Sequence, residues 1–177
     1  MKILFAIGFC GLFFIQSATA ERGDREKPIH LEADRATVED VNRKEGSRIS
    51  TFTGNVVLTQ GTLRILADKL VMKEDQQGFK HATATGNLVS FRQKRDRMDE
   101  YVEGWSERAE YDSKTDKIEL FRQARLKRGS DEVHGDYISY DMGTEFFKVV
   151  GSKERGVENG PDKRVRITIQ PKNKSEQ

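Results

Sequence analysis

Cysteine is almost absent from this chain of 177 residues, and the only one is Cys10, close to the N-terminus. If the first twenty residues are removed on export, as argued below, the remaining chain has no thiol. That excludes disulfide bridges and a cysteine nucleophile. The fold must then rest on apolar burial and backbone hydrogen bonds. A chain of about 157 residues can achieve this, because it buries roughly 68–70% of its unfolded surface.

An excess of one charge sign is also lacking. The chain has 31 Lys and Arg against 29 Asp and Glu, a formal net charge of +2. This balance argues against nucleic acid as a partner, because a polyanion demands a basic surplus. Hydrophobic residues are few as well, at 35% of the chain. They nevertheless gather in short β-like runs, which argues against a disordered chain.

A long apolar run occurs only at the N-terminus. Residues 3–15 are almost wholly apolar, follow Lys2, and precede the small residues at 18–20. This arrangement predicts a secretory signal peptide over 1–20, cleaved after the alanine at its end. The apolar run has about 13 residues, whereas a membrane-spanning helix needs about 20.

Alternation of apolar and polar residues dominates the chain from residue 28 on. Ile29, Leu31 and Ala33 alternate with polar residues, and Val165, Ile167 and Ile169 do the same near the C-terminus. This period of two predicts strands with one dry face. Further β-like segments are predicted at 48–60, 62–73, 84–93, 104–112, 118–128 and 131–141. The best helical candidate is a single turn at 37–42. These patterns predict an all-β protein.

Two short elements alternate along the chain as an internal repeat. Thr-Gly-Asn-apolar begins at Thr53 and again at Thr85, and a small residue followed by an acid forms the second element. The small–acid pairs lie at 33–34, 67–68, 109–110 and 135–136. Glycine inside a strand marks a bend or bulge, and units that cannot bury a face alone must stack. We therefore predict one continuous antiparallel sheet folded on itself, with two unclosed ends.

One position departs from this repeat. Phe121-Arg122-Gln123-Ala124 stands where a third Thr-Gly-Asn is expected. The sequence leaves open whether the chain also bends there.

Catalytic and metal-binding patterns are lacking. No Gly-x-Ser-x-Gly elbow is present, and His30, His81 and His134 occur singly in unrelated segments. An enzyme acting on envelope polysaccharide would need a pair of carboxylates, and no pair stands out. We expect no catalytic residue, no cofactor and no metal site.

Basic side chains flank several of the apolar strands. We interpret them as residues that keep the protein soluble and protect its sheet edges from stray pairing. The alternative is a basic rim that binds anionic headgroups above an apolar groove. These residues are Arg64, Lys69, Lys73, Arg92, Lys94, Arg95, Arg97, Arg122, Arg125, Lys127, Arg128, Arg164 and Arg166.

Four blocks in order along the chain carry a family resemblance. The longest is TFTGNVVLTQGTLRILADKL at 51–70, preceded by PIHLEAD at 28–34 and followed by VEG at 102–104 and HGDYISY at 134–140. In these blocks the chain resembles the OstA-like family of periplasmic lipopolysaccharide-transport proteins, over about residues 28–150. The block at 51–70 is specific, whereas the Gly-Asp-Tyr block alone would be a weak signal.

The resemblance implies a single twisted antiparallel β-jellyroll, open at both ends, over residues 21–170. The polar residues 171–177 form a tail that we expect to be disordered. The implied function is a periplasmic bridge that passes lipopolysaccharide from the inner-membrane complex to the outer-membrane translocon through an apolar groove. The implied partners are the lipid A acyl chains, further copies of the chain, and LptC-like and LptD-like proteins joined by end-to-end strand addition.

Nine apolar residues are expected in the groove or core by parity and by motif match. They are Ile29, Leu31, Phe52, Val56, Leu58, Leu66, Phe91, Leu120 and Phe147. Sequence does not separate those that touch lipid from those that only pack. The alternative function is an exported β scaffold that acts only through protein contacts at its edge strands.

Overall fold

The structure is a computed structural model that describes residues 24, 26–42, 46–96, 98–152 and 164–171. Every regular element in these residues is a β-strand, which confirms the predicted all-β class. The predicted signal peptide and all but the first residue of the predicted tail lie outside the described residues.

Ten strands form one sheet. They are β1 (Ile29–Glu32), β2 (Arg35–Asn42), β3 (Ser47–Gln60), β4 (Leu63–Asp75), β5 (Gly78–Lys94), β6 (Tyr101–Asp112), β7 (Lys117–Arg128), β8 (Asp131–Asp141), β9 (Phe147–Val150) and β10 (Arg166–Thr168). The predicted helical turn at 37–42 was wrong, because this segment is most of β2. Its backbone pairs with β3 throughout, and pairing with a neighbouring strand overrides a weak local preference.

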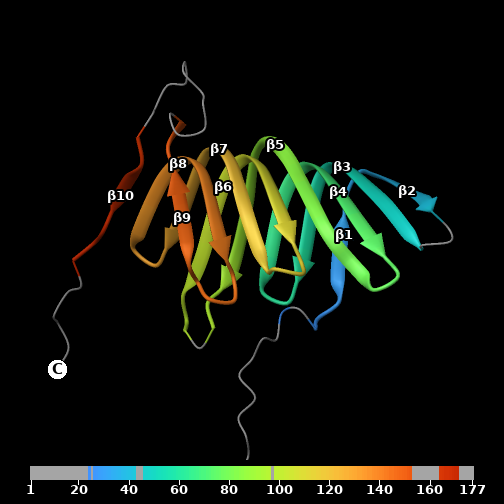
Figure 1. The fold of residues 1–177 in the computed structure, drawn as a ribbon, viewed down its shortest axis with the longest axis horizontal. Helices are drawn as coiled ribbons and strands as arrows, with labels where there is room; N and C mark the ends of the chain where they lie inside the picture. The colour runs from blue at the N-terminus through green and yellow to red at the C-terminus, as the bar shows by residue number, and fades with distance from the viewer. Residues whose placement is uncertain (1–23, 25, 43–45, 97, 153–163, 172–177) are drawn as a thin grey trace, which may run out of the picture.

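From β3 to β8 each strand pairs antiparallel with the next along the chain. The two ends of the sheet differ, because two short strands share each outer neighbour. At one end β1 pairs with residues 57–60 of β3 while β2 pairs with residues 47–53. At the other end β9 pairs with residues 137–140 of β8 while β10 pairs with residues 132–134. Figure 1 shows the strands side by side along the long axis, from β2 to β10.

Each long strand is interrupted near its middle. The pairing register shifts at 53–56 in β3, 66–69 in β4, 85–89 in β5, 105–108 in β6 and 121–124 in β7. These bends lie next to one another across the sheet and divide it into two legs. The first leg comprises β2, β9 and residues 47–53, 69–75, 78–85, 108–112, 117–121 and 137–141. The second leg comprises β1, β10 and residues 56–60, 63–67, 89–94, 101–105, 124–128 and 131–135.

The repeated elements meet at these bends. Gly54 and Asn55 have φ of 84° and 44°, and a Cβ on Gly54 would lie 2.2 Å from Asp34 Oδ2. The Asn55 side chain donates to that same oxygen at 3.0 Å. Two strands further on, in β5, the Asn87 backbone amide donates to Asp68 Oδ2 at 2.9 Å. In both cases the acid of a small–acid element accepts a hydrogen bond from the Asn of a Gly-Asn element on the adjacent strand.

The bend in β7, at 121–124, is the third position where the repeat expects Gly-Asn, and it uses different residues for the same contact. Arg122 and Gln123 have φ of 63° and 48°, so the chain bends there without a glycine. Gln123 Nε2 donates to Glu107 Oε1 at 2.8 Å. The Ala109-Glu110 pair of the repeat does not lie at this bend: Ala109 pairs regularly with β7, and the acid at the bend is Glu107. The bend that sequence left open is present.

Candidate functional site: the apolar interior between the legs

The inner faces of both legs are apolar. Buried apolar side chains of the first leg alternate with outward polar ones, and the same holds on the second. They are Leu70, Met72, Ala82, Ala84, Ala109, Tyr111, Ile118, Leu120, Ile138 and Tyr140 on the first leg, and Val56, Leu58, Leu63, Ile65, Ala67, Val89, Phe91, Val102, Ala124, Leu126 and Val133 on the second. The predicted two-residue alternation is what places them there.

Aromatic contacts cross from one leg to the other. Phe91 of the second leg stacks on Tyr140 of the first, with ring centroids 6.3 Å apart. The Phe91 ring fits because residue 104 is glycine: a Cβ there would lie 2.1 Å from Phe91 Cε1. Burial raises the pKa of the Tyr140 hydroxyl, so it stays neutral in this setting.

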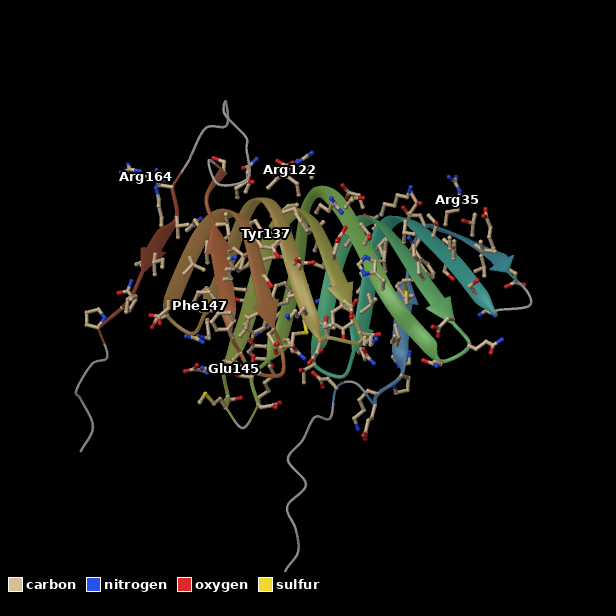
Figure 2. All side chains as sticks on the ribbon, in the orientation of Figure 1. Arg35, Arg122, Tyr137, Glu145, Phe147 and Arg164 are labelled. Carbon is tan, nitrogen blue, oxygen red and sulfur yellow. The ribbon has the colours of Figure 1, made fainter. Side chains whose placement is uncertain are left out.

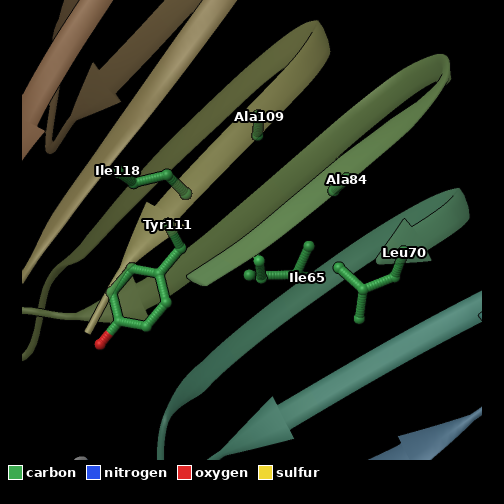
Figure 3. Close-up of a pocket in the computed structure, with 7 residues that line it drawn as sticks. Ile65, Leu70, Ala84, Ala109, Tyr111 and Ile118 are labelled. Atoms are coloured by element: carbon green, nitrogen blue, oxygen red, sulfur yellow. The ribbon is translucent and has the colours of Figure 1, made fainter. Parts of the chain in front are cut away.

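A small hollow lies between the legs at mid-length. Its lining is apolar, with Ile65 from the second leg facing residues of the first leg across it (Figure 3). The first-leg residues are Leu70, Ala82, Ala84, Ala109, Tyr111 and Ile118. Three of them are alanines, which leaves space in front of Ile65. The hollow has a volume of about 10 Å³, enough for one water molecule.

The two ends of the interior are not covered. On β2, Val38 pairs with Ser50, whose side chain is buried, so Val38 lies on the inner face; its side chain is nevertheless 59% exposed. On β10, Ile167 pairs with the buried Val133 and is 56% exposed. Apolar inner-face side chains are therefore open at both ends of the sheet, beside edge strands.

A polar contact joins the tips of the two legs. Arg95, in the hairpin after β5, donates from Nε and Nη2 to the Glu145 carboxylate, with the Nη2–Oε2 distance at 2.6 Å. Glu145 lies in the hairpin between β8 and β9, at the lower edge in Figure 2, whereas Arg122 of the third bend lies at the upper edge. The hydrogen bond to Glu145 raises the pKa of Arg95 above its ordinary value.

Most basic side chains predicted along the strands face outward. Arg92 covers the Tyr101 ring at 3.7 Å from its centroid, and Arg125 covers Trp105 at 4.6 Å. Arg128 differs, because it pairs with the buried Val102 and covers the half-buried Phe147 ring of the other leg at 5.4 Å.

Eight of the nine predicted groove or core residues lie on the inner faces. Val56, Leu58, Phe91 and Leu120 are buried, and Ile29, Leu31, Phe52 and Phe147 are half-buried against that core. The prediction for Leu66 was wrong, because this residue is 36% exposed and lies on the outer face. Ile65 and Leu66 are adjacent and both apolar, so alternation had to choose between them, and the buried neighbour is Ile65.

Sequence reasoning missed several inner residues. Ile65, Tyr111, Tyr140 and Gly104 all line or shape the interior. Parity with Leu63 could have identified Ile65, whereas the match of Gly104 to the Phe91 ring depends on strands paired in register.

The described residues contain no group of three His, Cys, Asp or Glu side chains able to hold a metal ion. In the same residues, no helix is long and apolar enough to cross a membrane.

Comparison with known proteins agrees with this architecture. The chain is 32% identical over 153 residues to the lipopolysaccharide export system protein LptA of Escherichia coli K12, covering 85% of this chain and 74% of the relative. It is 26% identical over 160 residues to LptH of Pseudomonas aeruginosa, covering 90% and 88%. The LptA protein of Haemophilus influenzae is 31% identical over 139 residues, with 77% of each chain covered.

A solved structure shares the fold. The crystal structure of LptH, described as the LptA-homologous periplasmic component of the lipopolysaccharide transport device of P. aeruginosa, matches with a TM-score of 0.72. The match has 25% identity and covers 84% of this chain and 99% of that one. The family described as "LptA/(LptD N-terminal domain) LPS transport protein" matches residues 30–146. The resemblance found in the sequence is thereby confirmed, and the chain belongs to this LptA/LptD N-terminal family.

Proposed function

We propose that this protein is a periplasmic carrier of lipopolysaccharide that shelters the acyl chains between its two legs. The observation that carries the proposal is the inner face itself. It is apolar along the sheet from Val56 on β3 to Val133 on β8, and it is uncovered at both ends. Relatives named as lipopolysaccharide export proteins support the same substrate.

Burial of methylene groups supplies the driving force. Each buried methylene contributes about 0.8 kcal/mol, so acyl chains are costly to leave in water. The hollow at Ile65 has room for about one water molecule, so an acyl chain that enters there requires the legs to separate. The sugars remain in water outside.

The uncovered ends support a bridge built by strand addition. An incoming strand that pairs with β2 or β10 would satisfy free backbone groups and cover Val38 or Ile167. Because the two ends are different surfaces, copies would add head to tail without closing. We propose the same joint for LptC-like and LptD-like partners, at the inner and outer membranes respectively.

Adjacent residues provide a matched test. A photo-crosslinking residue at Ile65, which faces the interior, should label bound lipopolysaccharide. The same residue at Leu66, on the outer face, should not. Equal labelling at both positions, or labelling at Leu66 alone, would remove the interior as the lipid site.

The scaffold alternative makes a different prediction. A protein that acts only through edge contacts should yield no crosslink at Ile65 or Phe91 while still assembling end to end. Mass analysis of lipid extracted from freshly purified protein provides an independent check.

A further inference from the structure

Two arginines meet at the tips of the legs around one glutamate, Glu145. Arg95 engages Glu145 through a guanidinium fork, and its Nη1 donates to Glu100 at 2.6 Å. Arg128 reaches the same place from β7, where its Nη1 lies 3.5 Å from the Glu145 carbonyl oxygen. We call Arg95, Arg128 and Glu145 the tip cluster.

Arg128 is held differently from Arg95. Among the described residues, no carboxylate forms an ion pair with its guanidinium, which contacts only a carbonyl oxygen and the face of Phe147. Its position on an inner face distinguishes it from Arg92, which covers an aromatic ring outside and also pairs with Glu103 at 3.5 Å. The charge of Arg128 is therefore available to a further anion.

The tip cluster adjoins the apolar interior. Tyr140 stacks on Phe91, and the charges of Glu145, Arg128 and Arg95 all influence the pKa of its hydroxyl. Phe147, under Arg128, packs against the same core. An anionic group held by both arginines would therefore have apolar chains attached to it directed into the space between the legs.

We propose that Arg95 and Arg128 form the binding site for a phosphate group of the lipid, and that Glu145 occupies this site until the lipid arrives. A phosphate presents the same forked acceptors as a carboxylate, with more charge, so it can pair with two guanidiniums at once. The inference rests on the proposed function and adds to it the part of the substrate that is recognised.

Exchange of Glu145 for a phosphate would also affect the legs. The Arg95–Glu145 pair joins a hairpin of the second leg to a hairpin of the first, with side chains only 14% and 26% exposed. Loss of this pair removes the ionic tie between the tips. Headgroup binding and separation of the legs, which acyl chains require, would then occur together.

Binding of phosphorylated lipid A and of the same lipid after enzymatic removal of its phosphates tests the proposal. Arg128→Gln should weaken binding of the phosphorylated lipid about tenfold, as expected for one lost charge-assisted contact. Binding of the dephosphorylated lipid should stay within about twofold. Glu145→Gln should strengthen binding of the phosphorylated lipid, because the competing carboxylate is gone. Arg92→Gln, the outward counterpart, should change neither affinity.

Three outcomes would overturn the site. Arg128→Gln could weaken both lipids equally, which would indicate apolar packing alone. It could weaken neither, or Arg92→Gln could act as strongly.

If the wild-type protein binds neither lipid, the proposed function fails as well, whereas normal wild-type binding with an inert Arg128→Gln rejects only the phosphate site. Arg128→Lys, which keeps the charge without the fork, should show intermediate affinity and guards against a folding defect.

Competition with inorganic phosphate identifies the source of the ligand. If it displaces the phosphorylated lipid, the arginines accept free phosphate; if it does not, they require a phosphate presented by lipid. Either result keeps Arg95 and Arg128 as the phosphate site.

A distance measurement tests the displacement of Glu145. Residues 21–177 contain no cysteine, so spin labels can be placed at Met98→Cys and Phe146→Cys, exposed positions on the two hairpins. The label separation should increase on adding phosphorylated lipid and should already be longer with Glu145→Gln. An unchanged separation in both cases would overturn Glu145 as the occupant of the site.

Discussion

Phe91 and Gly104 fit together as a ring and a gap on neighbouring strands. They are register partners on β5 and β6, and the Cβ position of Gly104 lies 2.1 Å from Phe91 Cε1 and 2.9 Å from Leu120 Cδ1. Gly104→Ala must therefore displace a buried ring that stacks across the legs. We expect a loss of about 1–3 kcal/mol in the free energy of unfolding, measured in urea.

A second substitution makes the steric cause testable. Phe91→Leu removes the part of the ring that a Cβ at Gly104 would meet. In the Gly104→Ala background, Phe91→Leu should cost less than in the wild type, since its shape relieves the clash. Additive losses would show that Gly104→Ala acts through something other than the ring.

Arg122 provides a test of the bends. It holds φ of 63° with an exposed side chain, where the equivalent bend of β3 uses Gly54. Because a side chain disfavours this conformation, Arg122→Gly should raise the free energy of unfolding by up to about 1 kcal/mol. Thr85 is regularly paired with both neighbouring strands just before the bend in β5. Thr85→Gly should therefore lower the free energy of unfolding by about 0.5–1 kcal/mol. A similar loss for both would contradict backbone strain at Arg122.

Two carboxylates in hairpins make the free energy of unfolding depend on pH in the acid range. Hydrogen bonds from the Thr115 and Lys114 amides lower the pKa of Asp112, and those from Thr144 and Gly143 lower the pKa of Asp141. With folded pKa values below the unfolded value of about 3.9, both groups stabilise the fold above that pH. This contribution disappears as pH falls through the folded pKa values.

The double variant Asp112→Asn with Asp141→Asn should isolate this contribution. It should be less stable than the wild type near neutral pH, because an amide is a weaker acceptor than a carboxylate. Chemical unfolding at decreasing pH should show the two proteins converging in stability. A constant difference down to about pH 2 would mean that these carboxylates are not the titrating groups.

Val38 and Val41 form a matched pair for end-to-end assembly. Each side chain is 59% exposed, but Val38 lies on the inner face of β2 whereas Val41 lies at the register irregularity between Asp40 and Asn42. Neither change to Asp should alter monomer stability by more than about 0.5 kcal/mol. Val38→Asp should weaken self-association about tenfold or more in sedimentation equilibrium, and Val41→Asp should leave it nearly unchanged.

The opposite end can be blocked in the same way. Ile167→Asp should leave the β1–β2 end intact, just as Val38→Asp leaves the β9–β10 end intact. A mixture of the two variants should therefore form one-to-one dimers that grow no further. Long oligomers in the mixture, or dimers of either variant alone, would count against head-to-tail joining of these ends.

Alternation and repeats in the sequence were enough to predict an all-β chain, a sheet folded on itself, and most of its inner residues. Leu31, Phe52 and Phe91 were identified because strands place every second side chain on one face. Alternation failed at Ile65 and Leu66, where two apolar residues are adjacent and either parity fits. It also missed the strand at 37–42, where residues 37–41 are exposed on both faces.

The four sequence blocks indicated the family, and the repeated elements marked where most of the bends fall, because a glycine inside a strand permits a bend. What the tertiary structure decided are contacts between residues distant in the chain. Glu107 replaces Ala109-Glu110 at the third bend because strand register, not spacing, selects the partner of Gln123. Arg95 reaches Glu145, fifty positions away, only because the folded sheet brings the hairpins of its two legs together. Such pairings depend on how far the legs twist and close, which no local pattern encodes.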